Sequence, residues 1–257
     1  YNITYGRNLL TNSKETVYDQ NGGPSLVQNT DYQYNSKKQL SQRITSLSNG
    51  EKRHSFINYP FDYSSGSGFI DAMIARNIVA VPIEQVEAKE NSSGNISILS
   101  GNITKYKTSN VALKDMVLTT ENGSAIPLSN FKFTNRTLGV LPTSGSPTVF
   151  SPDNTYKTKI TFDLYDQKNN LSQRTTEGND VKSYIWDYDG VYPIAVITNS
   201  GTNDIAYTSF ETSGSGGWTF SGAASPDAAS ITGSKDYFLN GSNNVTKPGL
   251  TSSKSFI

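Results

Sequence analysis

The chain of 257 residues has no cysteine, one histidine and two methionines. Without thiols it can form no disulfide, no thiolate nucleophile and no cysteine-ligated zinc site. With His54 as its one imidazole, it cannot build a metal site that needs two histidines. A Ser-His-Asp arrangement would have to run through His54, which has Arg53 rather than a carboxylate beside it. We therefore predict that His54 is a solvated strand residue, and that the chain is not an enzyme and uses no cofactor.

Net charge and long apolar runs are also absent. Lys plus Arg and Asp plus Glu both count 22, so no long-range field attracts nucleic acid, and we expect no nucleic-acid partner. No run is long and apolar enough to cross a bilayer, which predicts that there is no transmembrane segment. No basic or apolar leader precedes Tyr1, and we interpret the chain as a fragment of a longer polypeptide.

The residues that are abundant favour strands and turns. The chain has 21 glycines and 15 tyrosines among many serines, threonines and asparagines, a composition typical of short strands. Residues 157–165 alternate apolar and polar side chains, as a half-buried strand requires, and Tyr184, Trp186 and Tyr188 form a second alternating stripe. Residues 70–77 are the one helix candidate. The sequence predicts an all-β fold.

One stretch of the chain occurs twice. Residues 34–43 recur as residues 165–174, and after a short shift in spacing the match resumes, with residues 55–59 set against 183–188. Such self-similarity indicates a copied supersecondary unit that seldom buries its own apolar face. Each copy has a strand ending in Tyr, then Asp or Asn, a polar turn, Leu, a polar strand, Gly and an aromatic strand. An Asp or Asn after the Tyr can accept hydrogen bonds from turn amides, so we predict a structural role for these positions: Tyr18, Asp19, Tyr34, Asn35, Leu40, Gly50, Tyr165, Asp166, Leu171, Gly178, Trp186, Tyr188, Asp189 and Gly190.

This pattern resembles that of the YD-repeat proteins, which include Rhs elements, bacterial wall-associated proteins and the teneurin ectodomain. The resemblance covers residues 1–211 and is closest to the large secreted proteins of Bacteroidetes, through phrases such as residues 59–63, 192–195 and 205–211. It implies a non-catalytic scaffold at the cell surface, in which hairpins form a spiralling shell segment that encloses a toxin or displays adhesive modules. It also implies that the partners are the rest of a long chain and, as a type IX secretion substrate, the outer-membrane translocon. Asn35 departs from the family's Asp, and the family's autocleavage segment has no match.

The chain divides into two regions in this interpretation. Residues 1–204 form the repeat β-sheet, in which residues 64–155 are irregular hairpins of the same sheet. A flexible Gly- and Ser-rich hinge lies at residues 212–217. By the same resemblance, residues 205–257 begin a β-sandwich like a carbohydrate-binding module. That sandwich is incomplete, because such a fold needs about 100 residues.

Two alternatives to a scaffold remain open. Trp218 and Phe220 could form a platform on which the sugar rings of a cell-surface glycan stack. Asp187 and Asp189, two residues apart, could be a glycosidase pair or part of a calcium cluster. We favour a structural use, in which Asp187 faces solvent and Asp189 with Gly190 begins a turn. We likewise interpret Glu84, Glu87 and Glu90 as a solvated edge that discourages strand pairing, so no metal site is predicted.

Overall fold

The computed structural model describes residues 6, 8–227, 230, 233–240 and 242–250. The chain forms two compact units, divided between Lys159 and Ile160. The predicted all-β fold is confirmed, with a large antiparallel sheet whose strands follow one another in space as they do in sequence. This division falls within the strand formed by residues Tyr156–Tyr165. The boundary between a repeat sheet and a β-sandwich, which the sequence predicts at residue 205, stays a prediction.

With one short strand left aside, each strand of this sheet after the first pairs with the strand that precedes it in the sequence, as consecutive hairpins require. The one strand off this path is a two-residue segment that pairs with the sixth strand. The strands of the sheet are β1 (Asn12–Tyr18), β2 (Pro24–Tyr34), β3 (Leu40–Ser46), β4 (Lys52–Asn58), β5 (Glu84–Glu90), β6 (Ile96–Tyr106), β7 (Lys114–Thr120), β8 (Ile126–Pro127), β9 (Tyr156–Tyr165), β10 (Leu171–Thr176), β11 (Asp180–Asp187) and β12 (Tyr192–Thr198).

Four hairpin turns share one hydrogen-bond pattern. They begin at Asp19, Asn35, Asn91 and Asp166, and in each the side-chain Oδ1 accepts hydrogen bonds of 2.8–3.0 Å from the backbone N–H groups two and four residues on. The backbone N–H of each first residue also donates to the carbonyl of the fifth, at 2.8–3.0 Å. This confirms the turn role predicted for Asp19, Asn35 and Asp166, and adds a fourth instance at Asn91.

The fourth residue of each turn has a positive φ, which closes a tight hairpin with the twist of its strands. Two of the turns have glycine there, with φ of 78° at Gly22 and 83° at Gly94. The two repeat copies instead have Lys38 at 63° and Asn169 at 68°, so they hold non-glycine residues in the left-handed region. The hydrogen bonds that the Asn35 and Asp166 side chains accept therefore help to hold this conformation, which asparagine tolerates but lysine rarely adopts.

The two repeat copies share their first turn, but their pairing differs soon after it, because Arg43 lies opposite Tyr32 whereas Arg174 lies opposite Phe162, one position from the matching residue. Strands β2, β3 and β4 correspond to β9, β10 and β11, but the second connection takes residues 47–51 in one copy and only residues 177–179 in the other. Pairing also shifts by one position, because Arg43 lies opposite Ser55 whereas Arg174 lies opposite Lys182. The shorter loop and the shifted register together account for the change in spacing between the matched sequences.

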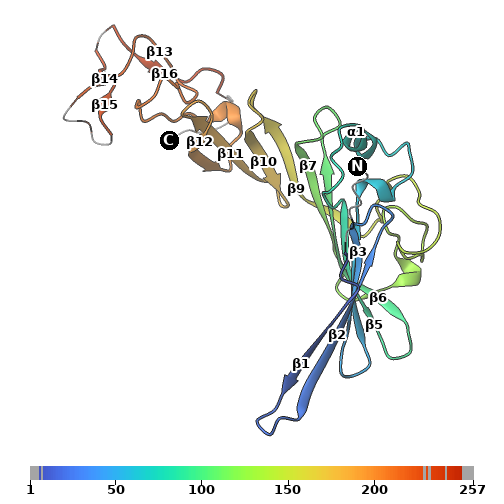
Figure 1. Ribbon diagram of the computed structural model, residues 1–257. Helices are drawn as coiled ribbons and strands as arrows, with labels where there is room; N and C mark the ends of the chain where they lie inside the picture. Colours follow the sequence, from blue (N-terminus) through green and yellow to red (C-terminus); the bar gives the residue numbers. More distant parts are fainter. Residues whose placement is uncertain (1–5, 7, 228–229, 231–232, 241, 251–257) are drawn as a thin grey trace, which may run out of the picture. The chain divides into compact units, whose positions relative to one another are not determined.

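In the first unit, one face of the sheet is covered by α1 (Phe69–Ala75) and by an irregular segment at residues 128–155, which begins with η2 (Leu128–Asn130). Phe150 packs against both hydrophobic clusters, whose fully buried members include Phe56, Ile98, Phe131, Phe133, Ile70 and Met73. The β1–β2 hairpin runs on beyond the neighbouring strands (Figure 1) and leaves large apolar side chains exposed, among them Val17 and Tyr18.

The predictions for this middle block are partly right. The helix expected at residues 70–77 is confirmed as α1, and strands β5 to β8 are hairpins of the same sheet as expected. Residues 128–155 are not hairpins. The carbonyl of Phe131 accepts a hydrogen bond from Gly139 within the same segment, and buried Phe131 and Phe133 hold this loop on the sheet through packing.

In the second unit, residues 199–214 lie over one face of strands β10 and β11. The Ser183 hydroxyl donates to the Ser200 carbonyl at 2.7 Å, and the Gln173 side chain accepts from the Thr202 amide, at the start of η3 (Thr202–Asp204), at 3.1 Å. In the segment predicted to be a flexible hinge, residues 212–217, the Thr212 hydroxyl donates to Asp187 and the Ser215 carbonyl accepts from the Trp218 amide, and the flexibility itself stays a prediction.

Beyond this segment the strands are short. The strand β13 (Thr219–Phe220) pairs with β16 (Val245–Thr246), and β14 (Ser225–Pro226) pairs with β15 (Lys235–Asp236). These pairs agree with a β-rich region, while a β-sandwich in residues 205–257 stays a prediction.

We predict that Asp166→Ala lowers the free energy of unfolding by about 1–2 kcal/mol, because two turn amides lose their side-chain acceptor. Urea denaturation followed by circular dichroism measures the change. Gln167→Ala is the matched control, since Gln167 is exposed in the same turn. Equal stability of the two variants would show that the Asp166 side chain does not hold the turn.

Candidate functional site

Two aromatic residues of the repeat motif donate hydrogen bonds to backbone carbonyls of neighbouring segments. The Tyr34 hydroxyl donates to the Leu10 carbonyl at 2.9 Å, and Trp186 Nε1 donates to the Leu171 carbonyl at 2.8 Å. Tyr188 lies beyond β11 in the following turn, with φ of 53°, so it does not continue the stripe predicted from Tyr184 and Trp186. Tyr34 and Trp186 thus have a structural role through their hydrogen bonds, while Tyr188 belongs to the turn after β11.

Asp187 and Asp189 have separate environments. Asp187 is buried, and its oxygens accept hydrogen bonds from the Tyr188 amide at 2.7 Å and from the Thr212 hydroxyl, so the prediction that it faces solvent is wrong. It is buried because residues 199–214 cover its face of the sheet. Asp189 is exposed and forms an ion pair with Lys168, which lowers the pKa of that carboxyl. The turn predicted at Asp189 and Gly190 is confirmed, with φ of 75° at the glycine.

A further carboxylate of the second unit, that of Glu211, is also held by hydrogen bonds. It accepts hydrogen bonds from the Ser234 amide at 2.9 Å, the Ser234 hydroxyl at 3.0 Å and the Lys235 amide at 2.8 Å. These bonds lower the pKa of Glu211, and the bond from the Lys235 amide has the largest effect. Both oxygens of Glu211 and of Asp187 are therefore already engaged in holding loops. Within the described residues, no group of three or more His, Asp or Glu side chains is placed to hold a metal ion.

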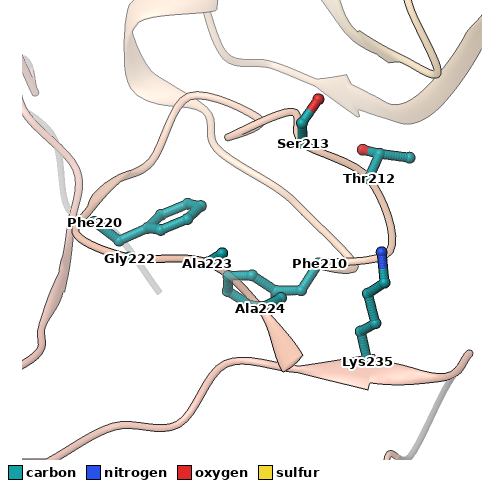
Figure 2. A pocket seen from close by; sticks show the side chains of 8 residues that line it. All are labelled: Phe210, Thr212, Ser213, Phe220, Gly222, Ala223, Ala224 and Lys235. Atoms are coloured by element: carbon teal, nitrogen blue, oxygen red, sulfur yellow. The ribbon is translucent and has the colours of Figure 1, made fainter. Parts of the chain in front are cut away.

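Trp218 and Phe220 do not form one platform. Trp218 lines an apolar hollow of about 360 Å³ together with Tyr207, Phe210, Tyr237 and Leu239. Phe220 lines a different hollow of about 340 Å³, which Figure 2 shows with Phe210 and Lys235 at its wall. Phe210 is shared by the two hollows. The sequence identified both residues but could not show that they face separate spaces.

Phe210 is the centre of this aromatic cluster. Its ring stacks on Tyr237 with centroids 5.4 Å apart and meets Phe220 edge to face at 5.5 Å. Its φ of 61° lies in the left-handed region, which is uncommon for a bulky residue, and its amide bonds to the Thr208 hydroxyl at 3.1 Å. A strained residue held in a cluster beside a hollow is typical of a ligand site. In the Trp218 hollow, Tyr207 and Leu239 are exposed, so aromatic and apolar surface there is open to a ligand.

His54 is not a solvated residue, because it is 4% exposed in the first unit. It shares the inner face of β4 with Phe56, on whose ring it stacks at 5.7 Å, and β5 closes the other side of β4. Gln42 Nε2 lies 2.9 Å from His54 Nδ1, and Glu90 Oε2 lies 2.9 Å from His54 Nε2. With the amide assigned in this way, the ring is neutral and carries its proton on Nε2. The alternation of His54 with Phe56 was the signal in the sequence for burial.

The solvated edge predicted from three glutamates is also wrong, since β5 lies between β4 and β6. Glu87 is exposed, but Glu90 binds Lys52 and His54, and Glu84 is 1% exposed. The carboxylate of Glu84 accepts four hydrogen bonds of 2.7–3.0 Å, from the Asn58 amide, the Thr134 amide and hydroxyl, and the Tyr156 hydroxyl. Burial raises the pKa of Glu84 although these hydrogen bonds oppose the rise. Through the same bonds, the carboxylate joins the strands to the covering loop and is not available to solvent.

No family model matches the chain, and no curated protein matches it. In the part of the chain that the structure describes, no helix has the length and apolar character needed to span a membrane.

We predict that stability falls as pH drops below about 6.5. Burial lowers the pKa of His54 below its ordinary 6.5, so the unfolded chain takes up a proton that the folded chain resists. The stabilisation present above 6.5 is lost as pH falls, by at most about 1.4 kcal/mol per pH unit for one proton. Urea denaturation at pH 7.5, 6.5 and 5.5 measures the slope.

His54→Gln is the control for this slope, because the chain has a single histidine and the carboxylates are unchanged. The variant should show a flatter dependence over the same range. Parallel curves for the two proteins would mean that His54 does not carry the effect.

Proposed function

We propose that the chain is a non-catalytic scaffold segment of a large cell-surface repeat protein of the YD-repeat type. The observation that carries the proposal is the shared turn geometry of the two repeat copies, in which the side chains of Asn35 and Asp166 accept the same pair of turn hydrogen bonds. A motif that specifies one hairpin wherever it occurs is a means of extending a sheet, one hairpin at a time.

The strand order and the free edges of the sheet also support this proposal. Strands are added in sequence order, so each new hairpin uses the edge left by the one before. The order ends at β1 and β12, and both strands have one unpaired backbone edge within the described sheet. Tyr192 and Val196 on β12 are 61% and 57% exposed, which leaves apolar surface beside a free edge. Further hairpins of the same long chain are the natural partners of such edges.

The same features support a surface role without chemistry of its own. The carboxylates of Asp187 and Glu211 accept hydrogen bonds from nearby backbone and hydroxyl groups, so they serve to hold loops in place. In this proposal the wall encloses a toxin or displays adhesive modules, and the chain reaches the surface as a type IX secretion substrate.

We predict that the protein is exposed at the surface of the cells that produce it. Protease added to intact cells should remove the signal of an antibody raised against the chain, while a cytoplasmic marker stays intact. Immunoblotting measures both signals. Signal that is protected until the cells are lysed would contradict a surface scaffold.

Glycan binding by the second unit is a second candidate function. It is favoured by the Trp218 hollow, where Tyr207 is 46% exposed beside Trp218 and Tyr237. Aromatic faces that remain open to solvent are suited to stacking on the apolar faces of sugar rings. An adhesive module of this kind is compatible with the scaffold, because it would be displayed by the same sheet.

We predict that Trp218→Ala abolishes binding of the chain to a polysaccharide array without changing its circular dichroism spectrum. The loss of one stacking face is the reason. Tyr192→Ala is the control, because Tyr192 is an exposed aromatic residue that does not line the hollow. Array binding that survives Trp218→Ala, or no binding by the unmodified chain, would remove the glycan-binding function from this hollow.

A further inference from the structure

The first unit contains a polar hollow of about 290 Å³ beside the first repeat hairpin. Its wall is formed by the end of β2, by β3 and β4, by η1 (Pro60–Asp62) and by the loop that follows Arg136. The side chains that matter for its chemistry are Tyr34, Asn35, Asn58, Asp62, Arg136 and Thr143. This volume is at the lower end of the range for small-molecule sites, so the hollow fits one small ligand.

Arg136 gives the hollow a positively charged wall. The residue is 9% exposed, and its Nε and Nη1 donate to the carbonyls of Ser144 and Asn135 at 2.8 Å each, while Nη2 donates to the carbonyl of Pro142. No carboxylate among the described residues lies within 4.0 Å of these nitrogens. A guanidinium has five N–H groups, so two remain for a ligand after these three bonds.

Asp62 gives the same hollow a negatively charged wall. Its carboxylate accepts hydrogen bonds from the Tyr59 amide at 2.8 Å and from the Asn35 side-chain amide at 3.1 and 3.2 Å. These bonds fix its orientation and leave acceptor capacity on a carboxylate that has about four lone-pair sites. Burial raises the pKa of Asp62, while the charge of Arg136 opposes that rise. The two charged groups thus line one space without forming a direct ion pair.

The ligand class follows from charge and hydrogen bonding together. The single positive and single negative charge cancel, so neither an anion nor a cation is favoured as a whole. A wall that donates hydrogen bonds, at Arg136, and a wall that accepts them, at Asp62, match a molecule whose every edge carries both donors and acceptors. Tyr34, whose hydroxyl donates to the Leu10 carbonyl, also lines the hollow.

We propose that this hollow binds a neutral polyhydroxylated ring, a free hexose or the terminal hexose of a glycan. Neighbouring hydroxyl groups of the ring bridge Arg136 and Asp62, each donating to the carboxylate and accepting from the guanidinium. The site lies in the first unit and is independent of both the scaffold role and the aromatic hollow of the second unit.

The test is isothermal titration of the full chain with glucose, galactose, mannose and N-acetylglucosamine, and with glucuronate and glycine as charged and zwitterionic comparisons. At least one neutral sugar should bind. Thr143→Tyr, an exposed change at the wall, should fill the space and abolish that binding. Ser146→Tyr is the matched control in the same loop, outside the hollow, and should bind as the unmodified chain does.

Asp62→Asn should weaken the same binding about tenfold, the usual effect of losing a hydrogen bond to a charged group. The proposal is overturned if no neutral sugar binds, if glucuronate or glycine binds more tightly than every neutral sugar, or if binding survives Thr143→Tyr. Loss of binding in Trp218→Ala with no loss in Thr143→Tyr would also overturn it, and would place the sugar in the aromatic hollow. None of these outcomes bears on surface exposure, which tests the scaffold separately.

Discussion

The hydrogen bonds between one Asp or Asn side chain and two turn amides are the interaction on which the rest of the sheet depends. At Asn35 and Asp166 they hold a left-handed Lys38 or Asn169 in place, and this closes a hairpin in a fixed register. A one-residue change of register would turn every side chain of the strand to the other face. The buried face of β4 and the polar hollow beside β2 both require that register.

The local chemistry of the fold could be predicted from the sequence, because it acts over a few residues. The turn at Asp166, the helix α1 and the strand β9 each follow from side chains that lie close together in the chain. The duplicated segment also identified which strands correspond. Its matched spacing could not reveal the one-position shift between Ser55 and Lys182, because register depends on the partner strand as well as on the motif.

Burial of the polar residues could not be predicted, because it depends on contacts distant in sequence. Glu84 appears solvated among Glu87 and Glu90 until residues 128–155 fold back and supply Thr134. A buried carboxylate without donors would cost several kcal/mol, so its burial requires the covering loop to be in place. Arg136 and Asp62 meet at one hollow for the same reason, since the distant loop and η1 must both be folded. Phe210 shows the same limit in the aromatic cluster, whose members come from separate segments.

The sequential order of the strands determines how the chain can acquire its structure. Most strands pair across connections of only a few residues, so the entropy lost in closing each loop is small. Local topology of this kind favours rapid folding. A chain emerging end first from a narrow channel could therefore form β2 against β1, and then β3 against β2, before its later residues are available. Within the described large sheet, the longer connections from β4 to β5, from β6 to β8 and from β7 to β9 would have to wait for a longer length of polypeptide.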